Sequence, residues 1–548
     1  MNAFTQQGDV EADGYVSDPL HVPNGDADTC WSRVNLGEFI VGVPTPLTWN
    51  LWDHGTRLSG PEIYYRMGLA TGQERRHADD SQTITTVLFG WPVCNVDAMR
   101  HFIDRAGKEA GDSFERNMLG ELSNRPKTTT TPKTRRGISG IKTTYMLLTY
   151  PKLLERTVSE TRDWWRDSVQ RCNSASLKQA KAIVADAFAR YPNVCVVAGS
   201  GGTVGGQIIF SLLEKALPTG KEKLLPKIVS GGDNLAEARM LAALWDVSEG
   251  KLSLTDFLDE YGFYGSDVGE CLNRSWRENP NALTPIIENY RSSDGALDPS
   301  KRHQERVKMR ASALDELRAA AGTFRFSWIG VLLSYAEKMT QWREDGKTCT
   351  LRVHDVVRAG ARRVGELLVA DGDLDNPNDV FFLSQAEIEA APFPNLRETV
   401  LFRQAKRSFY EEIDMPDAFV GMPNVKFRSH GQDVETLDDV TAENISGIGV
   451  SPGTIIGRAR VVLDPADCGD FERGDILVCR NTDPSWAPLF TLAGGIVTDM
   501  GGMLSHGAII ARELGVPCVV NTRTGTRSLS DRQRIHIDGT TGKIEVLP

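Results

Sequence analysis

The sequence predicts a multidomain α/β protein in which a large, mainly α-helical domain precedes a smaller module of strands and helices. Before about residue 414, long segments repeat apolar residues every three or four positions, as amphipathic helices do. After about residue 446, short apolar runs separated by turn residues indicate β-strands. A chain of 548 residues has room for roughly two to four domains.

The composition excludes several classes of protein. Hydrophobic residues make up 40% of the chain and charged residues 25%, which is ordinary for a globular protein. The formal net charge of -11 argues against a nucleic-acid binder, which normally carries a basic face. The polar start lacks the features of a signal peptide, and no apolar run reaches membrane-spanning length, so we expect a cytoplasmic protein without a membrane partner. Nine isolated cysteines predict neither a disulfide framework nor a metal site.

The part of the chain before residue 446 divides into three segments of different composition. Residues 1–30 are rich in Gly, Asp and Asn and predict a flexible leader. Residues 31–414 form the predicted helical domain. Residues 415–445 are acidic, contain proline and lack clear periodicity, which indicates a linker or hinge. Within the helical domain, the clearest helices are expected at residues 174–191, 300–322 and 351–372.

Residues 446–548 predict a compact mixed α/β module. Two short helices fit between its strands, at residues 485–493 and 506–514. The Gly-Thr-Thr-Gly sequence at 539–542 separates two alternating runs and predicts a hairpin. The strands are expected at residues 454–463, 475–481, 494–499, 517–521 and 534–547.

The segment "GGMLSHGAIIARELGVPCVV", residues 501–520, contains a single histidine at the predicted start of a helix. Ser505 is a good N-cap, Gly515 suits the position after the helix, and Pro517 prevents its continuation. His506 is then the first helical residue, where unpaired backbone N–H groups and the helix dipole favour an anion.

An imidazole at such a position can act as a nucleophile toward phosphorus, and the same N–H groups would hold the charge of the phosphohistidine. Gly501 and Gly502 would let the preceding backbone approach the phosphate. The alternative is that His506 is only a structural residue near a helix start.

This segment resembles the signature of the swivelling β/β/α phosphohistidine domain of phosphoenolpyruvate-utilising enzymes. The resemblance extends over the whole C-terminal module and implies that His506 is phosphorylated and carried between two distant active sites. The Leu504-Ser505 pair before the histidine is similar to that of rifampin phosphotransferase-like proteins, so pyruvate is not the expected acceptor. Among the matching residues, Ser505 and Arg512 are expected to take part in catalysis with His506. The matching residues are Gly501, Gly502, Ser505, His506, Ala508, Ile509, Ala511, Arg512, Glu513, Gly515 and Pro517.

The helical part resembles the acceptor-binding domain of rifampin phosphotransferase-like proteins at residues 31–55, 257–280 and 343–388. In that family, two basic residues four apart flank the acceptor hydroxyl and the incoming phosphoryl group, and Arg343 and Lys347 match them. Such a pair neutralises charge on the transferring oxygens, and the lysine could help to deprotonate the hydroxyl. The alternative is an exposed helix end with local ion pairs.

Aromatic residues near the matching segments are candidates for an acceptor pocket, although core packing is the alternative. We expect His303 and His354 to lie on the surface and His536 to face away from the core. The glycine-rich segment 196–207 lacks the Gly-Lys-Ser/Thr ending of a P-loop and indicates a turn or close packing. The candidate pocket residues are Trp49, Trp52, His54, Phe263 and Tyr264.

The resemblance also implies a donor site. Rifampin phosphotransferase-like proteins carry an ATP-grasp domain, for which the residues before position 31 leave no room, so we expect a separate ATP-grasp type subunit that binds Mg-ATP. The nearest split systems phosphorylate phenol or alkylphenols such as p-cresol, with AMP and phosphate as the other products. The acceptor is therefore expected to be a phenol. The alternatives are a natural-product or antibiotic hydroxyl, or a non-catalytic regulatory homologue.

Overall fold

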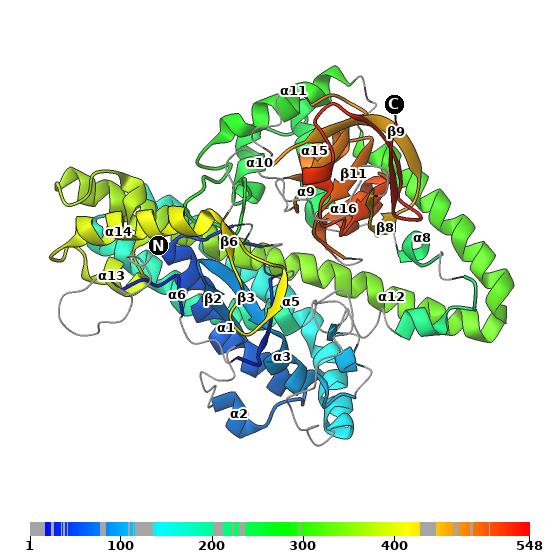
Figure 1. Cartoon of the computed structure of the whole chain (residues 1–548), viewed down its shortest axis with the longest axis horizontal. Helices are drawn as coiled ribbons and strands as arrows, with labels where there is room; N and C mark the ends of the chain where they lie inside the picture. Colours follow the sequence, from blue (N-terminus) through cyan, green and yellow to red (C-terminus); the bar gives the residue numbers. More distant parts are fainter. Residues whose placement is uncertain are drawn as a thin grey trace. The chain divides into compact units, whose positions relative to one another are not determined.

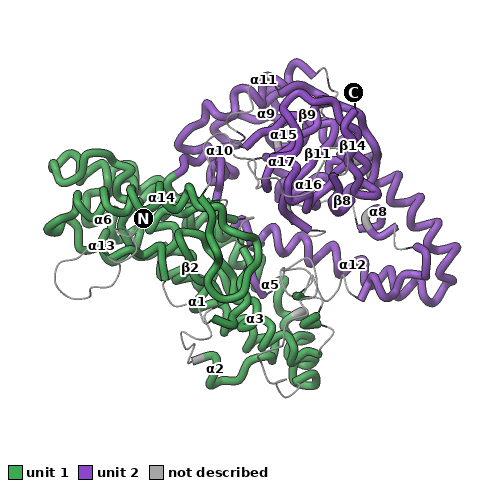
Figure 2. The backbone as a smooth tube through the Cα atoms, in the orientation of Figure 1, with its two compact units in different colours: residues 1–197, 269–272, 349–432 green, residues 198–268, 273–348, 433–548 purple. Residues whose placement is uncertain are grey.

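The chain forms two compact units, each assembled from several segments of the sequence (Figure 2). Unit 1 comprises residues 1–197, 269–272 and 349–432, and unit 2 comprises residues 198–268, 273–348 and 433–548. The computed structural model describes residues 17–22, 27–33, 36, 39–40, 42–76, 84–107, 110–112, 114–115, 135–200, 212–221, 224–229, 236–293, 295, 298–427, 445–463, 465, 471–482, 486–502 and 505–547.

Unit 1 is mainly helical (Figure 1). The helical segment predicted at residues 31–414 is divided between the two units, since residues 198–268 and 273–348 belong to unit 2. The predicted helix at 174–191 is present as α6. Proline lies at the first position of α1, where its missing N–H is not needed. The helices are α1 (Pro46–Arg66), α2 (Gly72–Arg76), α3 (Val96–Ile103), α5 (Arg136–Cys172), α6 (Leu177–Ala198), the second part of α12 (Pro299–Ala370), the 3₁₀ helix η6 (Pro377–Phe382), α13 (Gln385–Ala390) and α14 (Leu396–Glu411).

Unit 1 also contains a four-stranded antiparallel sheet that the periodicity did not predict. Its order is β2-β3-β1-β5, with β1 (Cys30–Ser32) between β3 (Trp91–Asn95) and β5 (Ala418–Val420). A tight turn joins β2 (Thr85–Leu88) to β3. A separate two-stranded antiparallel sheet is formed by β4 (Ile413–Asp414) and β6 (Lys426–Phe427). The start of the expected linker therefore contributes a strand to the sheet of unit 1.

The described end of the expected leader is packed. Leu20 is buried in a hydrophobic core cluster of unit 1 that also contains Trp31 and Trp91. The Tyr410 hydroxyl donates a hydrogen bond to the Asp18 carboxylate at 2.6 Å. Residues 17–22 are thus tied to α14, because burial of Leu20 and this hydrogen bond both stabilise the docked segment.

Residues 269–272 belong to unit 1 through the buried side chain of Glu270. Its carboxylate accepts hydrogen bonds from the Thr45 N–H at 2.8 Å, the Thr45 hydroxyl at 2.7 Å and the Thr48 hydroxyl at 2.6 Å. The Leu272 N–H donates a fourth at 2.8 Å, and the Arg358 guanidinium donates to the Glu270 carbonyl at 3.1 Å. A buried carboxylate is stable only with such partners, so Glu270 anchors this segment to the start of α1.

The helices of unit 2 include a long hairpin made by the first two-thirds of α12. Gly322 interrupts α12 with a φ of 71°, so the chain turns back there, where glycine carries no steric cost. Ala313 and Leu317 before the turn pack with Ile329 and Leu333 after it. The remaining helices are α8 (Leu225–Val229), α9 (Ala236–Ser248), α10 (Leu254–Tyr261), the 3₁₀ helix η5 (Pro280–Leu283) and α11 (Thr284–Ser292).

The C-terminal part of unit 2 is the mixed α/β module that the sequence predicts. Its eight-stranded sheet has the order β7-β14-β13-β9-β10-β11-β12-β8, and β9 to β12 are parallel neighbours. The hairpin expected at 539–542 joins β13 to β14. The elements are β7 (Ile445–Ser446), β8 (Ile448–Ser451), β9 (Thr454–Val461), β10 (Ile476–Cys479), α15 (Ala487–Leu492), β11 (Gly495–Thr498), α16 (His506–Leu514), β12 (Cys518–Val520), α17 (Gly525–Ser528), β13 (Arg534–Asp538) and β14 (Lys543–Val546).

The expected orientation of His536 is confirmed. Ile535 and Ile537 on either side of it are fully buried in the core of the module. The His536 side chain is 31% exposed, with Nδ1 3.5 Å from a Glu545 carboxylate oxygen. Alternate residues of a strand point to opposite faces, which explains the difference.

Among the described residues, none of the helices combines the length and the apolar character that are needed to cross a lipid bilayer.

Candidate functional site

The predicted histidine helix is present, and its bounds agree with the sequence. α16 begins at His506 and ends at Leu514, with Gly515 in the left-handed conformation at φ 66°. The Ser505 hydroxyl accepts a hydrogen bond from the Ala508 N–H, which caps the first turn. The backbone of His506 therefore lies at the N-terminus of a capped helix, where the dipole and the remaining N–H groups favour an anion.

The loop that leads from β11 to this helix is held by Asp499. Its carboxylate accepts hydrogen bonds from the Thr522 hydroxyl at 3.0 Å and from the Thr526 N–H at 3.1 Å. Gly501 follows with a φ of 122°, and a Cβ at this position would lie 2.9 Å from the Ser505 hydroxyl oxygen. Glycine is required at 501 both by the backbone angle and by the close approach to the helix cap. Gly502, the second predicted loop glycine, has no such neighbour.

Thr482 is a residue of the site that the sequence reasoning missed. It is buried in the loop between β10 and α15. A Cβ at Gly507 would lie only 2.7 Å from its hydroxyl oxygen, so Thr482 lies against the first turn of α16, next to the backbone of His506. No local pattern marks Thr482, since parallel packing of β10 and β11 brings the two loops to the same edge of the sheet.

Replacing Ser505 with alanine is expected to destabilise the C-terminal module by about 1 kcal/mol, since it removes the acceptor for the Ala508 N–H. Glycine at 505 is expected to cost only a few tenths of that, because glycine is a much better N-cap residue than alanine. Urea denaturation of the three proteins measures both values. Equal stability of wild type and Ser505→Ala would contradict the cap.

Arg512 lies away from the start of the helix. It is buried in the last turn of α16, six residues after His506, which is about 9 Å along the axis. Its guanidinium lies 3.4 Å from the carbonyl oxygen of Val450, to which it donates. This contact joins α16 to β8, so the structure gives Arg512 a packing role.

Arg343 and Lys347 both lie on α12, one helical turn apart. Lys347 is 8% exposed, and its Nζ is 3.5 Å from a carboxylate oxygen of Glu237, which is 1% exposed. Arg343 is 20% exposed, with Nε 4.0 Å from the Glu344 carboxylate. The alternative of an exposed helix end is wrong, because α12 continues to Ala370 and Lys347 is buried.

Within unit 2, the helix that pairs with Lys347 also contacts the C-terminal α/β module. Glu237 lies in the first turn of α9, and α9 contacts both α15 and α16. Lys347 on α12 is therefore connected to α16, the helix that begins at His506, through the intervening helix α9.

The five candidate pocket residues are divided between the units. Trp49 lies in the core cluster of unit 1, while Phe263 and Tyr264 are buried and packed on each other in unit 2. Trp52 is half-buried, with its Nε1 3.4 Å from the Gly269 carbonyl, and the His54 ring lies 5.9 Å from that of Phe188. The structure thus gives Trp49, Phe263 and Tyr264 core positions.

The expectation that His354 lies on the surface is wrong. Its ring is buried in unit 1, and its Nε2 lies 2.9 Å from the Tyr191 hydroxyl. Burial, together with the nearby Arg358 guanidinium, lowers the pKa of His354 to about 3. The charged neighbours in the sequence of α12 misled the prediction, because Arg358 itself is buried and bonded to Asp355. The side chain of His303 lies outside the described residues.

His354 is expected to make the protein acid-sensitive. Its pKa in the unfolded chain is about 6.5, so the unfolded state binds a proton first and stability falls as the pH drops from about 6.5 toward 3. His354→Gln keeps a hydrogen-bonding side chain without the titration. The free energy of unfolding of wild type, relative to that of the variant, should fall by about 2 kcal/mol between pH 7 and pH 5. A difference that does not change with pH would contradict the buried neutral imidazole.

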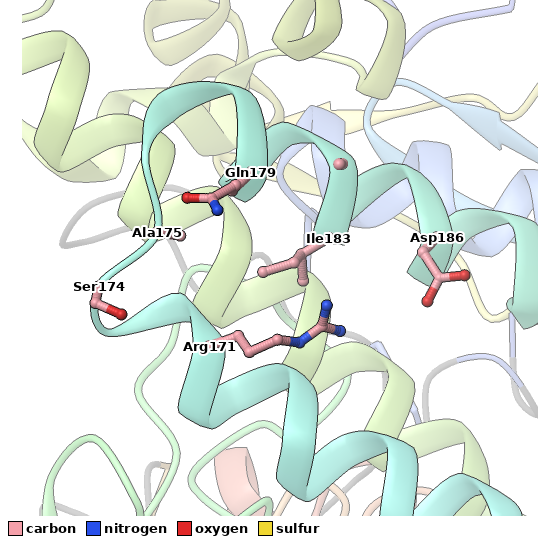
Figure 3. Close-up of a pocket in the computed structure, with 7 residues that line it drawn as sticks. Arg171, Ser174, Ala175, Gln179, Ile183 and Asp186 are labelled. Carbon is pink, nitrogen blue, oxygen red and sulfur yellow. The ribbon is translucent and has the colours of Figure 1, made fainter.

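Figure 3 shows a pocket between the end of α5 and the start of α6 that contains none of the predicted site residues. Its acidic residue, Asp186, already accepts hydrogen bonds from the Trp164 indole and the Arg190 guanidinium. Its basic residue, Arg171, is paired with Asp167. The lining residues are Arg171, Ser174, Ala175, Gln179, Ala182, Ile183 and Asp186.

Within the part of the chain that the structure describes, no cluster of three or more His, Cys, Asp or Glu side chains could hold a metal ion. Of the glycine-rich segment 196–207, the residues from 201 on lie outside the described ones.

Two segments match known protein families. Residues 471–542 match the family described as "PEP-utilising enzyme, mobile domain", and residues 249–344 match "Rifampicin phosphotransferase fourth domain". The first segment contains His506 and most of the parallel sheet, and the second ends just after Arg343. Two segments of unit 2 are thus similar to the mobile domain of PEP-utilising enzymes and to the fourth domain of rifampicin phosphotransferase.

Several similar proteins are named rifampicin phosphotransferase. The chain is 32% identical over 312 residues to rifampicin phosphotransferase of Streptomyces sviceus, and the match covers 55% of this chain and 35% of the relative. For rifampicin phosphotransferase of Bacillus subtilis the identity is 30% over 301 residues, covering 54% and 34%. An uncharacterised phosphotransferase of Bacillus subtilis, YvkC, is 29% identical over 340 residues, covering 59% and 40%. The matches span little more than a third of these relatives.

Proposed function

We propose that this chain, with its PEP-utilising mobile domain, is the phosphoryl-carrying part of a phosphotransferase. In this proposal His506 receives a phosphoryl group and passes it to a hydroxyl group of an acceptor. The observation that carries the proposal is the position of His506 at the first residue of α16, behind the Ser505 cap, in the segment that matches the mobile domain.

The surroundings of the helix start support this role. The N–H groups at the N-terminus of α16 and its dipole favour the charge of a phosphoryl group. The close approach of Thr482 to Gly507 adds a hydroxyl group beside this turn. Gly501 leaves the space in front of the Ser505 hydroxyl free of a side chain.

In the transfer step, the bond between phosphorus and an imidazole nitrogen of His506 breaks while a bond to the acceptor oxygen forms. The acceptor hydroxyl gives up one proton and the imidazole takes up one as the P–N bond breaks, so the histidine returns to its neutral form and the step balances. Arg343 and Lys347 would neutralise the negative charge on the phosphoryl oxygens during this transfer. Arg343 then acts through its permanent charge and its planar set of N–H donors. Lys347 acts through its charge and through its ability to exchange a proton.

We propose a natural-product or antibiotic hydroxyl as the acceptor. The relatives described above are named for rifampicin, which favours this alternative over a small phenol. A phenol such as p-cresol, the acceptor expected from the sequence, has no support from those names. Trp52 and His54 lie half-buried on α1 of unit 1, and their role as pocket residues stays a prediction from the sequence.

For the donor we propose Mg-ATP bound by a separate ATP-grasp type subunit. His506 would take the β-phosphoryl group, AMP would leave, and the γ-phosphoryl group would be transferred to water and released as phosphate. This arrangement predicts that the chain by itself acquires no phosphate from ATP.

The test is to incubate the chain with Mg-ATP labelled at the β-phosphorus, with and without a candidate nucleotide-binding subunit. The expected result is phosphate on the chain that is labile in acid and stable in alkali, and only when the subunit is present. Rifampicin, phenol and p-cresol are then added separately, and the acceptor is the compound that removes the label faster than water does. Labelling of the isolated chain would overturn the two-component arrangement, and the absence of labelling with every candidate donor would overturn the carrier role.

A further inference from the structure

The ion pair of Lys347 is an unusual feature of unit 2 because both charges are withdrawn from solvent. Lys347 on α12 and Glu237 on α9 are 8% and 1% exposed, and their charged atoms are 3.5 Å apart. Removing such charges from water costs several kcal/mol for each ion, which the attraction between them only partly offsets. Burial of this pair therefore needs an explanation other than the stability of the fold.

A second ion pair joins the same two helices, and its partly exposed charges avoid most of this desolvation cost. Arg239 on α9 and Asp345 on α12 lie 2.7 Å apart and are 40% and 16% exposed. This pair, two residues away along each helix, already links α9 to α12. The buried pair of Glu237 and Lys347 is therefore not needed to hold the two helices together.

The position of α9 supplies a functional reason. The helix contacts α15 and α16, so Glu237 belongs to the element that lies between Lys347 and the module with His506. A lysine ammonium ends a flexible stem with three donors, and it defines a position only when a partner restrains it. A buried carboxylate 3.5 Å away supplies that restraint.

We propose that Glu237 is a positioning residue, whose carboxylate holds the Lys347 ammonium in place for phosphoryl transfer from His506. Glu237 itself touches neither the phosphoryl group nor the acceptor. This inference rests on the proposed function. It adds to that function the requirement that transfer, but not phosphorylation of His506, depends on Glu237.

The two steps can be separated by phosphorylating the chain with phosphoramidate, a small donor with a P–N bond, which requires no partner subunit. The phosphorylated chain is then mixed with rifampicin or with phenol, and loss of phosphohistidine is followed in a single turnover. Glu237→Gln should acquire as much phosphohistidine as wild type. Its transfer rate at saturating acceptor should be at least about tenfold lower, since misplacement by about 1 Å can cost about a hundredfold. The half-saturating acceptor concentration should not change.

Matched variants separate positioning from structure. Asp345→Asn breaks the second pair between the same helices and should transfer at the wild-type rate. Glu237→Asp keeps the charge on a shorter side chain, should fold even if Glu237→Gln does not, and should restore part of the rate. Adding Glu237→Gln to Lys347→Met should cause no further loss, because the residue that it positions is already absent.

Three results would overturn the inference: a wild-type rate in Glu237→Gln and Glu237→Asp, an equal loss in Asp345→Asn, or independent effects in the double variant. Failure of the proposed function has a different signature. In that case wild type forms no phosphohistidine at His506, or neither acceptor discharges it faster than water does.

Discussion

Replacing His506 with alanine is expected to abolish the acid-labile phosphate that the chain acquires from Mg-ATP and a nucleotide-binding subunit. Alanine has no nucleophilic nitrogen, while the backbone N–H groups and the Ser505 cap that would hold the phosphate remain. Because alanine is a good helix former, α16 should persist, and the far-ultraviolet circular dichroism should be unchanged. The loss should exceed a thousandfold, down to the detection limit of a labelling experiment analysed after alkaline and acidic treatment.

His536→Ala is the matched control, because it removes a histidine of the same module from the half-exposed face of β13. This variant should be labelled as fully as wild type. Labelling that persists in His506→Ala, or that disappears in both variants, would contradict the assignment of the phosphoryl carrier to His506.

The C-terminal module could be predicted in detail because its signals are local. Ser505, Gly515 and Pro517 define the ends of α16 by capping rules that act within a few residues. The hairpin at 539–542 follows from turn chemistry in the same way. Each of these elements is defined by residues that are close together in the chain, so the sequence alone is enough to predict it.

The missed features depend on contacts between residues that are distant in the chain. β1 pairs with β3 and β5, and β5 lies almost 400 residues later, so neither partner marks it as a strand. His354 stands between charged residues that the fold buries and pairs, and so its periodicity suggested a surface. Lys347 is similar, since its partner Glu237 lies on a helix more than a hundred residues earlier. The sequence could identify Lys347 as a candidate but not the carboxylate that restrains it.

Replacing Glu270 with alanine is expected to lower the free energy of unfolding by about 3–5 kcal/mol, the usual range when one member of a buried polar network is removed. The side chain accepts four hydrogen bonds, from two groups of Thr45, the Thr48 hydroxyl and the Leu272 N–H. In the variant these donors stay buried without their acceptor, and each unsatisfied group costs about 1–3 kcal/mol before the structure relaxes. Urea denaturation followed by tryptophan fluorescence measures the change.

Two further variants show whether the loss belongs to the hydrogen bonds. Glu270→Gln keeps the size of the side chain but replaces one acceptor oxygen with a donor, so it should lose the bonds to one carboxylate oxygen and fall between wild type and Glu270→Ala. Glu288→Ala removes an exposed carboxylate from α11 and should change stability by no more than about 0.5 kcal/mol. If Glu270→Ala were as stable as Glu288→Ala, Glu270 would not anchor residues 269–272. Residues 269–272 would then be held by the hydrogen bonds to their backbone, such as those that the Arg358 and Arg362 guanidinium groups donate to the carbonyl oxygens of Glu270 and Leu272.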